Sequence, residues 1–526
     1  MKELVFEELT LRQKLGMVFT GFLNSWAKSE DNEEFLFELI KERALGVVWI
    51  QQGARDAEEM LEKVKELADY PIIVVTDAES GISTKNGDYL VGRHSAIGNT
   101  GDPKNAYVFG KVLGAVAHKM GYNMVCNPIM DIRPGFIRAL GSDKEMVTEF
   151  SAAMAQGLHD GGLLTLGKHY PGADNPLGID SHMTAAISYQ TKEELIEDGL
   201  YPYRKLMEQD LLDGIMTGHK KCVNIDPDHP ASMSKKVIDI IRELGFEGVI
   251  MTDALCMMGI KALYNDVESK GYAIAAGNDT ILPFTAESRK EFADLCEAYD
   301  QGLIPDDVLD AAVKRILEAQ HKTLSLPKDV EITEEEMEIF RNIDKNGVYA
   351  KTDEGVSTSL SRDGKYYFAV VIRNEMQIGS DGKIDVDTFS SKWHYPLKIK
   401  QKIMELFPNA AVKFIHEFPS QGQNVEVLNE SLGYDDVIFL TFTEPLSFTG
   451  KERLTHRLVT LIDAMRMTER VNTVIHFGNP LVLEDLPHMP RIIVGNVSEK
   501  SVEATLEVLA GEYPAKGKLT CEVNFK

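Results

Sequence analysis

The sequence predicts an α/β protein in which a (β/α)8 TIM-like barrel is followed by a smaller, doubly wound α/β sandwich domain. The first two-thirds of its 526 residues alternate short β-branched runs with longer amphipathic stretches, which is the pattern of βα units and a parallel sheet. Polar residues follow several of these runs, as expected where parallel strands end on one face of a barrel. We predict that the barrel spans residues 1–330, a helical and polar connection 331–364, and the second domain 365–526.

Seven apolar runs are the candidate strands of the barrel, at 45–50, 72–76, 124–127, 163–166, 214–217, 248–252 and 280–282. Stretches with helical periodicity lie between them, at 57–67, 104–119, 145–158, 192–209 and 235–244. A last helix is expected at 305–321, where apolar residues recur on one helix face. Seven predicted strands are one fewer than the eight that form a barrel of this type.

The second domain is predicted from a new alternation that begins after a polar stretch. An acidic segment at 331–338 and a polar run at 351–359 have the composition of an interdomain connection. Strands are expected at 366–372, 411–415, 436–442, 471–477 and 492–494, and helices at 397–406, 453–467 and 501–509. No glycine-rich phosphate-binding motif occurs in this part, so a nucleotide site is not predicted.

Charge and cysteine content exclude several classes of protein. The formal net charge is −26, from 56 basic and 82 acidic residues, which disfavours nucleic acid or an anionic membrane as a partner. The five cysteines are an odd number at irregular spacings, which argues against a disulfide framework and against a zinc site. The acidic N-terminus and the lack of a long apolar segment predict neither a signal peptide nor a membrane span. We therefore expect a cytoplasmic protein without a metal or cofactor.

Polar residues end most of the expected barrel strands. They are Asp77, Asp131, Lys168, His169, His219 and Asp253. In a parallel barrel the carboxyl ends of all strands meet on one face, so these residues are expected to converge although they lie far apart in the sequence. Barrel enzymes carry their chemistry on that face, so we expect this cluster to form an active site.

The loop at 168–182 carries a second pattern, because it combines His, Asp and Lys with Pro and Gly. Asp180 and His182 are two residues apart, so in an extended backbone the carboxylate can reach the imidazole. Such a pair keeps the imidazole in one tautomer and stabilises its charged form, which suits a proton donor near neutral pH. The alternative for an isolated D-x-H pair is two solvated residues on a surface loop.

The motif Lys168-His169-Tyr170-Pro171-Gly172, followed by Asp180-Ser181-His182, resembles the K-H-F-P-G…D-S-H loop of glycoside hydrolase family 3. Within that family it is similar to the bacterial β-N-acetylglucosaminidase (β-N-acetylhexosaminidase) branch, in which a His–Asp dyad replaces the usual carboxylic acid as general acid/base. The segment 173–179 departs from the family pattern. The stretches 474–480 and 511–519 resemble the second domain of these enzymes, so the resemblance spans nearly the whole chain.

The resemblance implies roles for the residues of this site. Asp253, at the end of 248–253, looks like the catalytic nucleophile of the family. Taken alone, an Asp at this position could equally cap the following helix. His182 would be the acid/base and Asp180 its orienting partner, whereas Lys168 and His169 would bind sugar hydroxyls. His169 is the rival candidate for the acid/base.

The segment 74–81 resembles the family's D-x-E-G-G-R motif, whose Asp accepts hydrogen bonds from two sugar hydroxyls. The resemblance therefore implies that Asp77 binds the sugar. An Arg of that motif is missing here, since Ser80-Gly81-Ile82-Ser83 follows Glu79. Arg93 is a candidate substitute.

Arg138 resembles the Arg of the family's R-S-F-G segment, which contacts the sugar, and its alternative is a surface ion pair. His219 matches a family His near the site, which would either contact the ligand or support its neighbours. Both are predicted here as substrate-binding residues.

These residues together predict a retaining, exo-acting glycoside hydrolase that removes terminal β-linked N-acetylglucosamine from small glycans or muropeptide fragments, as in peptidoglycan recycling. Asp253 would form a covalent glycosyl-enzyme and the His182–Asp180 dyad would transfer the proton. The dyad also leaves transfer to phosphate open. One alternative is a β-glucosidase or β-xylosidase of the same family, and another is a catalytically inactive sugar-binding protein on this scaffold. The oligomeric state is not predicted.

Overall fold

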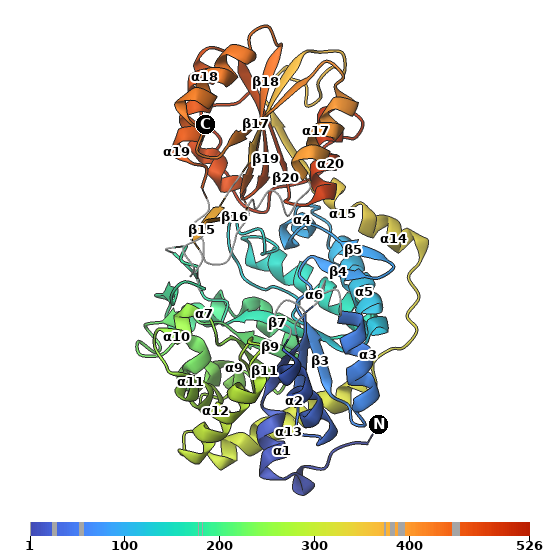
Figure 1. Cartoon of the computed structure of the whole chain (residues 1–526), viewed down its shortest axis with the longest axis vertical. Coiled ribbons are helices and arrows are strands. Elements are labelled where there is room, and N and C mark those ends of the chain that lie inside the picture. Colours follow the sequence, from blue (N-terminus) through green and yellow to red (C-terminus); the bar gives the residue numbers. More distant parts are fainter. Residues whose placement is uncertain are drawn as a thin grey trace.

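A computed structural model of the chain describes residues 2–23, 29–51, 57–176, 178–180, 182–372, 375–378, 384–387, 395–443 and 453–526. Two domains follow each other along the long axis of the molecule, and the N-terminus lies near the end of the first domain that is remote from the second (Figure 1). The first domain is built around a sheet of eight strands and the second around a sheet of six.

The eight-stranded sheet forms the barrel that the sequence predicts. Its strands are, in order, β1 (Thr20–Leu23), β2 (Val47–Ile50), β3 (Ile73–Thr76), β6 (Met124–Val125), β7 (Leu164–Tyr170), β9 (Gly214–Thr217), β11 (Val249–Ala254) and β12 (Thr280–Leu282). All neighbouring strands are parallel. A backbone bridge between Phe19 and Ile281 brings the first strand beside the last, so the barrel is nearly closed. Seven of the eight strands were expected, and β1 was not.

Helices cover the outside of the barrel. They are α1 (Leu11–Met17), α2 (Glu30–Lys41), α3 (Ala57–Leu67), α5 (Pro103–Met120), α6 (Lys144–Asp160), α7 (Lys192–Glu197), α8 (Tyr201–Met207), α9 (Lys235–Glu243), α11 (Asp266–Ala275), α12 (Ser288–Asp300) and α13 (Asp306–Thr323). The single helix expected at 192–209 is wrong, because two helices occupy this range. Pro202, in the first turn of α8, lacks the N–H that would continue a helix from α7. No helix in the described ranges combines the length and the apolar surface that a membrane span requires.

Short elements are inserted in the loops that follow the barrel strands. They are the antiparallel pair β4 (Gly81–Thr84) and β5 (Gly87–Leu90), helix α4 (His94–Gly98), the parallel pair β8 (Ile187–Ser188) and β10 (Lys221–Cys222), the 3-10 turn Ala231–Met233, and helix α10 (Met258–Lys261). These insertions follow β3, β7, β9 and β11, so they surround the face at which the predicted site residues lie.

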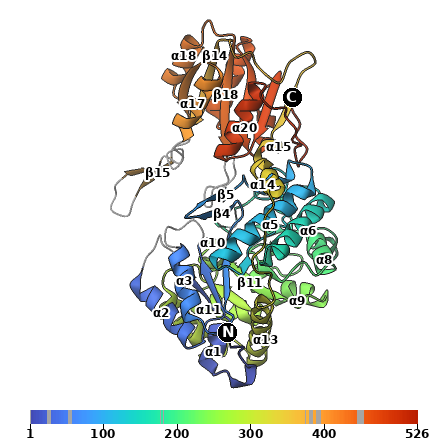
Figure 2. The ribbon, with the colours of Figure 1, turned by 90° about the vertical axis from the view of Figure 1, so that its right-hand side faces the viewer.

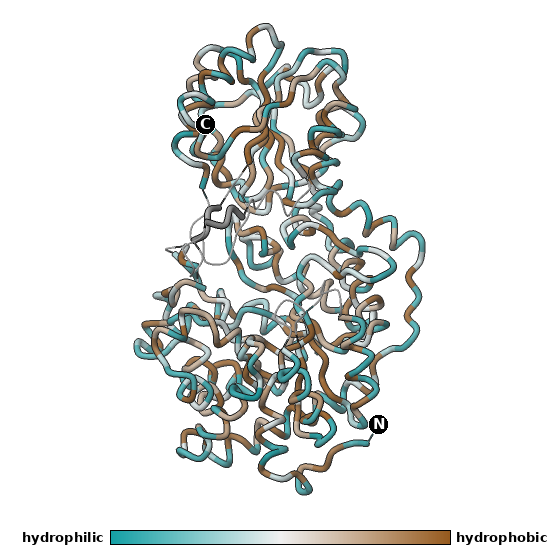
Figure 3. The backbone as a smooth tube through the Cα atoms, in the orientation of Figure 1, coloured by the Kyte–Doolittle hydropathy of each residue, from teal (hydrophilic) through white to brown (hydrophobic). Residues whose placement is uncertain are grey.

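The core of the first domain lies inside the barrel and between its strands and helices. Strands β1, β2, β3 and β9 are buried over their full length, as expected for a parallel sheet that is covered by helices. Helix α9 buries Val237, Ile238, Ile240 and Ile241 on one face, and each fully buried aliphatic side chain stabilises the fold by roughly 1.5–3 kcal/mol. Figure 3 shows the apolar strands in the middle of both domains.

The second domain has the mostly parallel sheet of a doubly wound fold. Its strand order is β13 (Tyr349–Thr352), β20 (Arg491–Gly495), β19 (Val471–Gly478), β18 (Asp436–Thr443), β14 (Tyr366–Ile372) and β17 (Ala411–His416), with β13 antiparallel to β20 and the other pairs parallel. Its helices are α17 (Tyr395–Leu406), α18 (Gln421–Glu430), α19 (His456–Met467) and α20 (Glu499–Leu509). Strands β15 (Glu375–Ile378) and β16 (Ile384–Asp387) form a separate antiparallel pair. Helix α18 was not expected.

The segment expected as a connection, 331–364, contains α14 (Glu334–Arg341), α15 (Ile343–Asn346) and β13. Its acidic residues begin a helix, because Thr333 caps α14 in a capping box with Glu336. Strand β13 joins the second sheet although it precedes residue 365. The boundaries at 330 and 364 stay predictions.

The second domain packs on the carboxyl-terminal face of the barrel, as Figures 1 and 2 both show. The Ser95 hydroxyl donates to the Asn496 side chain at 2.6 Å, and the Ser142 N–H donates to the Thr520 carbonyl at 3.0 Å. Ser95 belongs to the connection after β3, and Ser142 to the connection after β6. The second domain therefore holds the loops that carry part of the predicted site.

Candidate active site

Residues from distant strands meet at the carboxyl ends of the barrel, as the strand pattern predicts. The Lys168 ammonium lies 2.5 Å from a carboxylate oxygen of Asp77, although 91 positions separate the two residues. Asp77 directly follows β3, whereas Lys168 and His169 lie within β7, which extends to Tyr170 instead of ending at 166. Lys168 is buried, and Asp77 is partly exposed, with 37% of its side chain accessible.

Glu79 is the centre of a buried cluster of charges. The Lys168 Nζ atom lies 2.8 Å from its Oε1, and Arg138 donates to both of its oxygens, from Nε at 2.9 Å and from Nη2 at 2.6 Å. Burial alone would raise the pKa of Glu79, but Arg138 and Lys168 hold it well below its ordinary value. Glu79 is therefore ionised, and it fixes the positions of two cations that the sequence assigned to sugar binding.

Arg93 also approaches Glu79, with its Nη1 atom 3.8 Å from Oε2. It lies directly before α4, so the insertion after β3 supplies the cation that is absent after Glu79 in the sequence. No role is predicted for Glu79 itself from the sequence. The available signal was its place two residues after Asp77, within the segment that resembles D-x-E-G-G-R.

His169 is held by Asp131, because its Nδ1 atom lies 2.7 Å from Asp131 Oδ2. Burial alone would raise the pKa of Asp131, but His169 outweighs this effect and the pKa lies below its ordinary value. The ionised carboxylate therefore orients the imidazole at the end of β7 through Nδ1.

The Asp180–His182 pair is formed as the sequence predicts. His182 Nδ1 lies 2.7 Å from Asp180 Oδ1, and the same oxygen accepts the His182 backbone N–H at 2.9 Å. The two residues thus form a tight side-chain-to-backbone turn and not the extended backbone that was expected. The His182 carbonyl accepts the Met258 N–H at 3.1 Å, which attaches this loop to the segment that follows Asp253.

Described residues of the segment 173–179, where the sequence departs from the family pattern, form hydrogen bonds within it and to Gln190. The Asn175 side chain accepts the Ile179 N–H at 3.1 Å and donates to the Ile179 carbonyl at 2.8 Å. The Asp174 N–H donates to the Gln190 side chain at 3.0 Å. These contacts shape the loop before Asp180 without the residues that are usual in the family.

Asp253 is the second-to-last residue of β11, and its carboxylate accepts the Ala254 N–H at 2.7 Å. Burial alone would raise the pKa of Asp253, but His169, His219 and this N–H hold it below its ordinary value. Asp253 is therefore ionised at neutral pH, which a nucleophilic carboxylate requires.

His219 follows β9 and is buried. Its Nδ1 atom lies 2.8 Å from the Ser232 hydroxyl, and its Nε2 atom lies 3.0 Å from the Ala254 carbonyl oxygen. Burial lowers the pKa of His219, and the charge of Asp253 acts in the opposite direction without cancelling this effect. Both nitrogens of the neutral ring therefore have partners inside the protein. A direct contact between His219 and a substrate stays a prediction.

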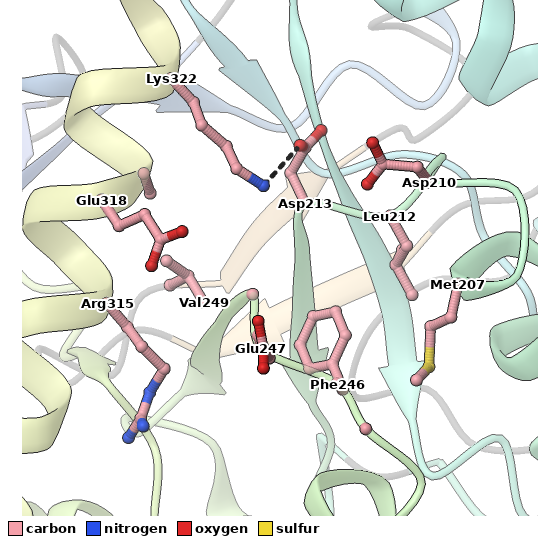
Figure 4. Close-up of a pocket in the computed structure, with 13 residues that line it drawn as sticks. Met207, Asp210, Leu212, Asp213, Phe246, Glu247, Val249, Arg315, Glu318 and Lys322 are labelled. Carbon is pink, nitrogen blue, oxygen red and sulfur yellow. Dashed lines mark ion pairs between the residues drawn. The ribbon is translucent and has the colours of Figure 1, made fainter.

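A cavity of about 190 Å³ lies at the other end of the barrel and is separate from this cluster. Asp213, which precedes β9, and Val249, which begins β11, line it together with Arg315, Glu318 and Lys322 of α13 (Figure 4). Lys322 points toward Asp213, and the ion pair between them spans 3.7 Å. Conserved chemistry in barrel enzymes lies at the carboxyl ends of the strands, so this cavity is not the candidate active site.

Comparison with known proteins gives matches over both domains. The family model of the glycosyl hydrolase family 3 N terminal domain matches residues 10–319. A β-hexosaminidase of Haemophilus influenzae is 29% identical over 243 residues, which are 44% of this chain and 69% of that protein. A β-N-acetylglucosaminidase/β-glucosidase of Cellulomonas fimi is 25% identical over 340 residues, which are 60% of this chain and 59% of that protein.

Two solved structures are similar along nearly the whole chain. A glycoside hydrolase family 3 β-N-acetylglucosaminidase from Paenibacillus sp. str. FPU-7 has a TM-score of 0.79 and 22% identity, and the alignment covers 98% of this chain and 100% of that chain. The β-glucoside phosphorylase BglX has a TM-score of 0.79 and 23% identity, and the alignment covers 98% of this chain and 94% of that chain. At these identities the likeness establishes the shared two-domain fold.

Proposed function

This chain belongs to glycoside hydrolase family 3, and on that premise we propose that it is a retaining, exo-acting β-N-acetylglucosaminidase of small glycans or muropeptide fragments. The observation that carries the proposal is the Asp180–His182 pair, with 2.7 Å between carboxylate and imidazole. A carboxylate-bound imidazole on a loop that is attached to the Asp253 segment supplies a proton donor close to a nucleophile.

Asp253 is the proposed nucleophile. A retaining glycosidase needs an ionised carboxylate that attacks the anomeric carbon and forms a glycosyl-enzyme. The lowered pKa of Asp253 and its place at the end of β11 support this role. The bond from the Ala254 N–H to Oδ1 orients the carboxylate and leaves Oδ2 as the proposed attacking atom.

His182 is the proposed general acid and base, and Asp180 its positioning residue. Because Nδ1 contacts Asp180, Nε2 is the ring atom that would donate a proton to the glycosidic oxygen and later accept one from water. General acid–base assistance of this kind contributes roughly 10²- to 10⁴-fold in rate. His169 forms an equivalent pair with Asp131, so it stays the rival candidate for this role, and its assignment to sugar binding rests on the family resemblance.

The sugar is proposed to bind through Asp77, Lys168, Arg138 and His169. Asp77 is the partly exposed acceptor of this group, so it can receive sugar hydroxyls, while the cations that Glu79 fixes can donate to sugar oxygens. All five cysteines are free thiols, which supports the cytoplasm as the proposed compartment. No cofactor or metal is part of the proposal.

The names of the relatives support the N-acetylglucosaminidase assignment, since the Haemophilus influenzae relative is a β-hexosaminidase. The Cellulomonas fimi relative carries both activities in its name, so a β-glucosidase is the second candidate function. A catalytically inactive sugar-binding protein would need neither an ionised carboxylate at the end of β11 nor a carboxylate-bound imidazole.

The proposal is tested by initial rates on the aryl β-glycosides of N-acetylglucosamine and of glucose, measured side by side. We expect strong turnover of the N-acetyl substrate, and its loss in His182→Ala and in Asp253→Asn. His488→Ala is the matched control, because His488 also lies 2.8 Å from an Asp, Asp353, but in the second domain. Preferred turnover of the glucoside, with near-normal rates in His182→Ala, would overturn the proposal.

A further inference from the structure

The turn that carries Asp77 and Glu79 is held by a buried asparagine. Asn127 lies just after β6, and its Nδ2 atom donates to the Ala78 carbonyl at 3.1 Å. The same carbonyl accepts the Gly81 N–H at 3.0 Å. Asn127 and Ala78 are both fully buried. The Asn127 amide therefore fixes the backbone on which both carboxylates stand.

The other polar atom of the Asn127 side chain is an acceptor that lacks a donor. Asn127 Oδ1 is buried and has no hydrogen-bond partner among the described residues. The amide can rotate by about 180° about its last bond, and only one of the two orientations donates to the Ala78 carbonyl. Buried acceptors in folded proteins are nearly always paired, so this oxygen requires a donor that also sets the orientation of the amide.

His94 is the buried side chain that can supply this donor. It is the first residue of α4, it is fully buried, and its ring lies edge-on to Phe109, with 6.2 Å between the ring centroids. Burial lowers the pKa of His94 to about 4, whereas the charge of Glu79 and the Asn127 side chain act in the opposite direction. The ring is therefore neutral at pH 7 and has one N–H, and neither of its nitrogens has a partner in the described part of the chain.

Contacts on both sides of His94 fix the start of α4. Arg93, before it, lies 3.8 Å from Glu79, and the N–H of Ser95, after it, donates to the Ile137 carbonyl at 3.0 Å. The start of α4 is therefore anchored both to the turn after β3 and to the loop after β6, and His94 lies between these two contacts in the sequence.

We propose that His94 and Asn127 form a positioning pair for the sugar site, in which the His94 ring donates its N–H to Asn127 Oδ1 and so holds the amide in the orientation that donates to the turn after β3. The inference rests on the proposed function, because the pair acts through Asp77, the proposed acceptor of sugar hydroxyls.

Asp77 depends more on this support than Glu79 does. Lys168 and Arg138 hold the Glu79 carboxylate from two directions, at 2.8 and 2.6 Å. The Asp77 carboxylate is partly exposed, and Lys168 is its one side-chain partner among the described residues. The position of Asp77 against the sugar is therefore set largely by the backbone that Asn127 holds.

Kinetics of Asn127→Ala, alone and combined with Asp77→Asn, test the proposal on the aryl β-N-acetylglucosaminide. Loss of the buried hydrogen bond is expected to lower kcat/KM by about tenfold in the otherwise wild-type enzyme. In the Asp77→Asn background the same substitution is expected to cost about twofold or less, because its effect passes through Asp77. Each variant is assayed at a temperature at which thermal unfolding scans show it to be folded.

Asn105→Ala is the matched control. Asn105, on α5, is also buried, its Nδ2 atom donates to the Asp102 carbonyl at 3.2 Å, and its Oδ1 atom likewise has no partner among the described residues. This substitution removes an equivalent contact that involves no residue of the proposed sugar site. It is expected to keep kcat/KM within about twofold of wild type.

The His94 half of the pair is tested by removal and by rescue. His94→Leu is expected to lower kcat/KM as much as Asn127→Ala does, and the two substitutions together no more than either alone. Gln and Asn place an amide N–H near the positions of the imidazole Nε2 and Nδ1 atoms, respectively. One of His94→Gln and His94→Asn is therefore expected to stay within about threefold of wild type.

The inference is overturned if Asn127→Ala keeps the wild-type kcat/KM, if its loss is as large in the Asp77→Asn background, or if neither amide at position 94 restores activity. Failure of the proposed function looks different, because the enzyme would then prefer the aryl glucoside, and the same ratios measured on that substrate decide the inference. Wild-type rates in Asp77→Asn alone would refute the proposed role of Asp77 and the inference with it.

Discussion

Replacement of Glu79 by Gln is predicted to disable the site while preserving its shape. Glu79 is buried and is the shared anionic partner of Lys168, at 2.8 Å, and Arg138, at 2.6 and 2.9 Å. Gln has nearly the same volume, but it carries no charge. Its amide NH2 is a hydrogen-bond donor and would face Lys168 and Arg138, which are donors themselves. Removal of one partner from a buried ion pair costs about 3–5 kcal/mol.

This loss of free energy is expected to lower both the stability of the fold and the catalytic rate, because Lys168 and Arg138 lose the anion that holds them in position to contact the sugar. If about 3 kcal/mol of it falls on substrate binding and the transition state, kcat/KM for the aryl N-acetylglucosaminide falls by about 10²-fold. The assay is steady-state kinetics at a temperature at which thermal unfolding scans show Glu79→Gln to be fully folded.

A matched control separates positioning from general destabilisation. Glu291, on α12, is equally buried and pairs with the buried Lys270 at 2.7 Å, away from the proposed sugar contacts. Glu291→Gln is expected to lower the melting temperature to a similar degree and to leave kcat/KM within about twofold of wild type. The reasoning is refuted if folded Glu79→Gln keeps wild-type kcat/KM, or if Glu291→Gln loses as much.

Two further predictions concern the dyad and the domain interface. Asp180→Asn is expected to lower kcat by about 10²-fold on alkyl glycosides and by less on aryl glycosides, whose leaving groups need less protonation; equal losses on both substrates would contradict a role in proton transfer. Burial raises the pKa of Asp344, which accepts the Gly92 N–H at 2.9 Å, to about 6. The Asp344 carboxyl therefore binds its proton more tightly in the folded protein than in the unfolded chain. Protonation contributes about 3 kcal/mol to the free energy of unfolding near pH 4, and this contribution is lost as the pH rises to about 6. Asp344→Asn should therefore raise the melting temperature above pH 6 and leave it unchanged near pH 4, and an offset that is independent of pH would contradict the assignment.

The fold was largely predictable because buried parallel strands are continuous apolar runs. Strand β1 was not predicted, because its sequence, Thr-Gly-Phe-Leu, is short and contains only one β-branched residue and a glycine. Helix α18 was not predicted, because its sequence has no clear apolar stripe. Val427 is its only fully buried residue in the described ranges. The helix expected at 192–209 is wrong because Pro202 lacks the N–H that one continuous helix would need at this position.

The site was predictable only where neighbours in space are also neighbours in sequence. Asp180 and His182 are two residues apart, and their contact could be inferred from that spacing. The place of Glu79 could not be inferred in this way, because Arg138 is 59 positions away and Lys168 lies on another strand, β7. A buried anion acquires its function from cations that only the fold brings to it.

The central claim, that Asp253 forms a covalent glycosyl-enzyme, is tested most directly by trapping that species. A 5-fluoro derivative of an activated N-acetylglucosaminyl donor slows breakdown of the intermediate, so that mass spectrometry of a protease digest can identify the labelled peptide. The account predicts a single sugar adduct on the peptide that contains Asp253, and none in Asp253→Asn. An adduct on another carboxylate, or a reaction that inverts the anomeric centre, would contradict it.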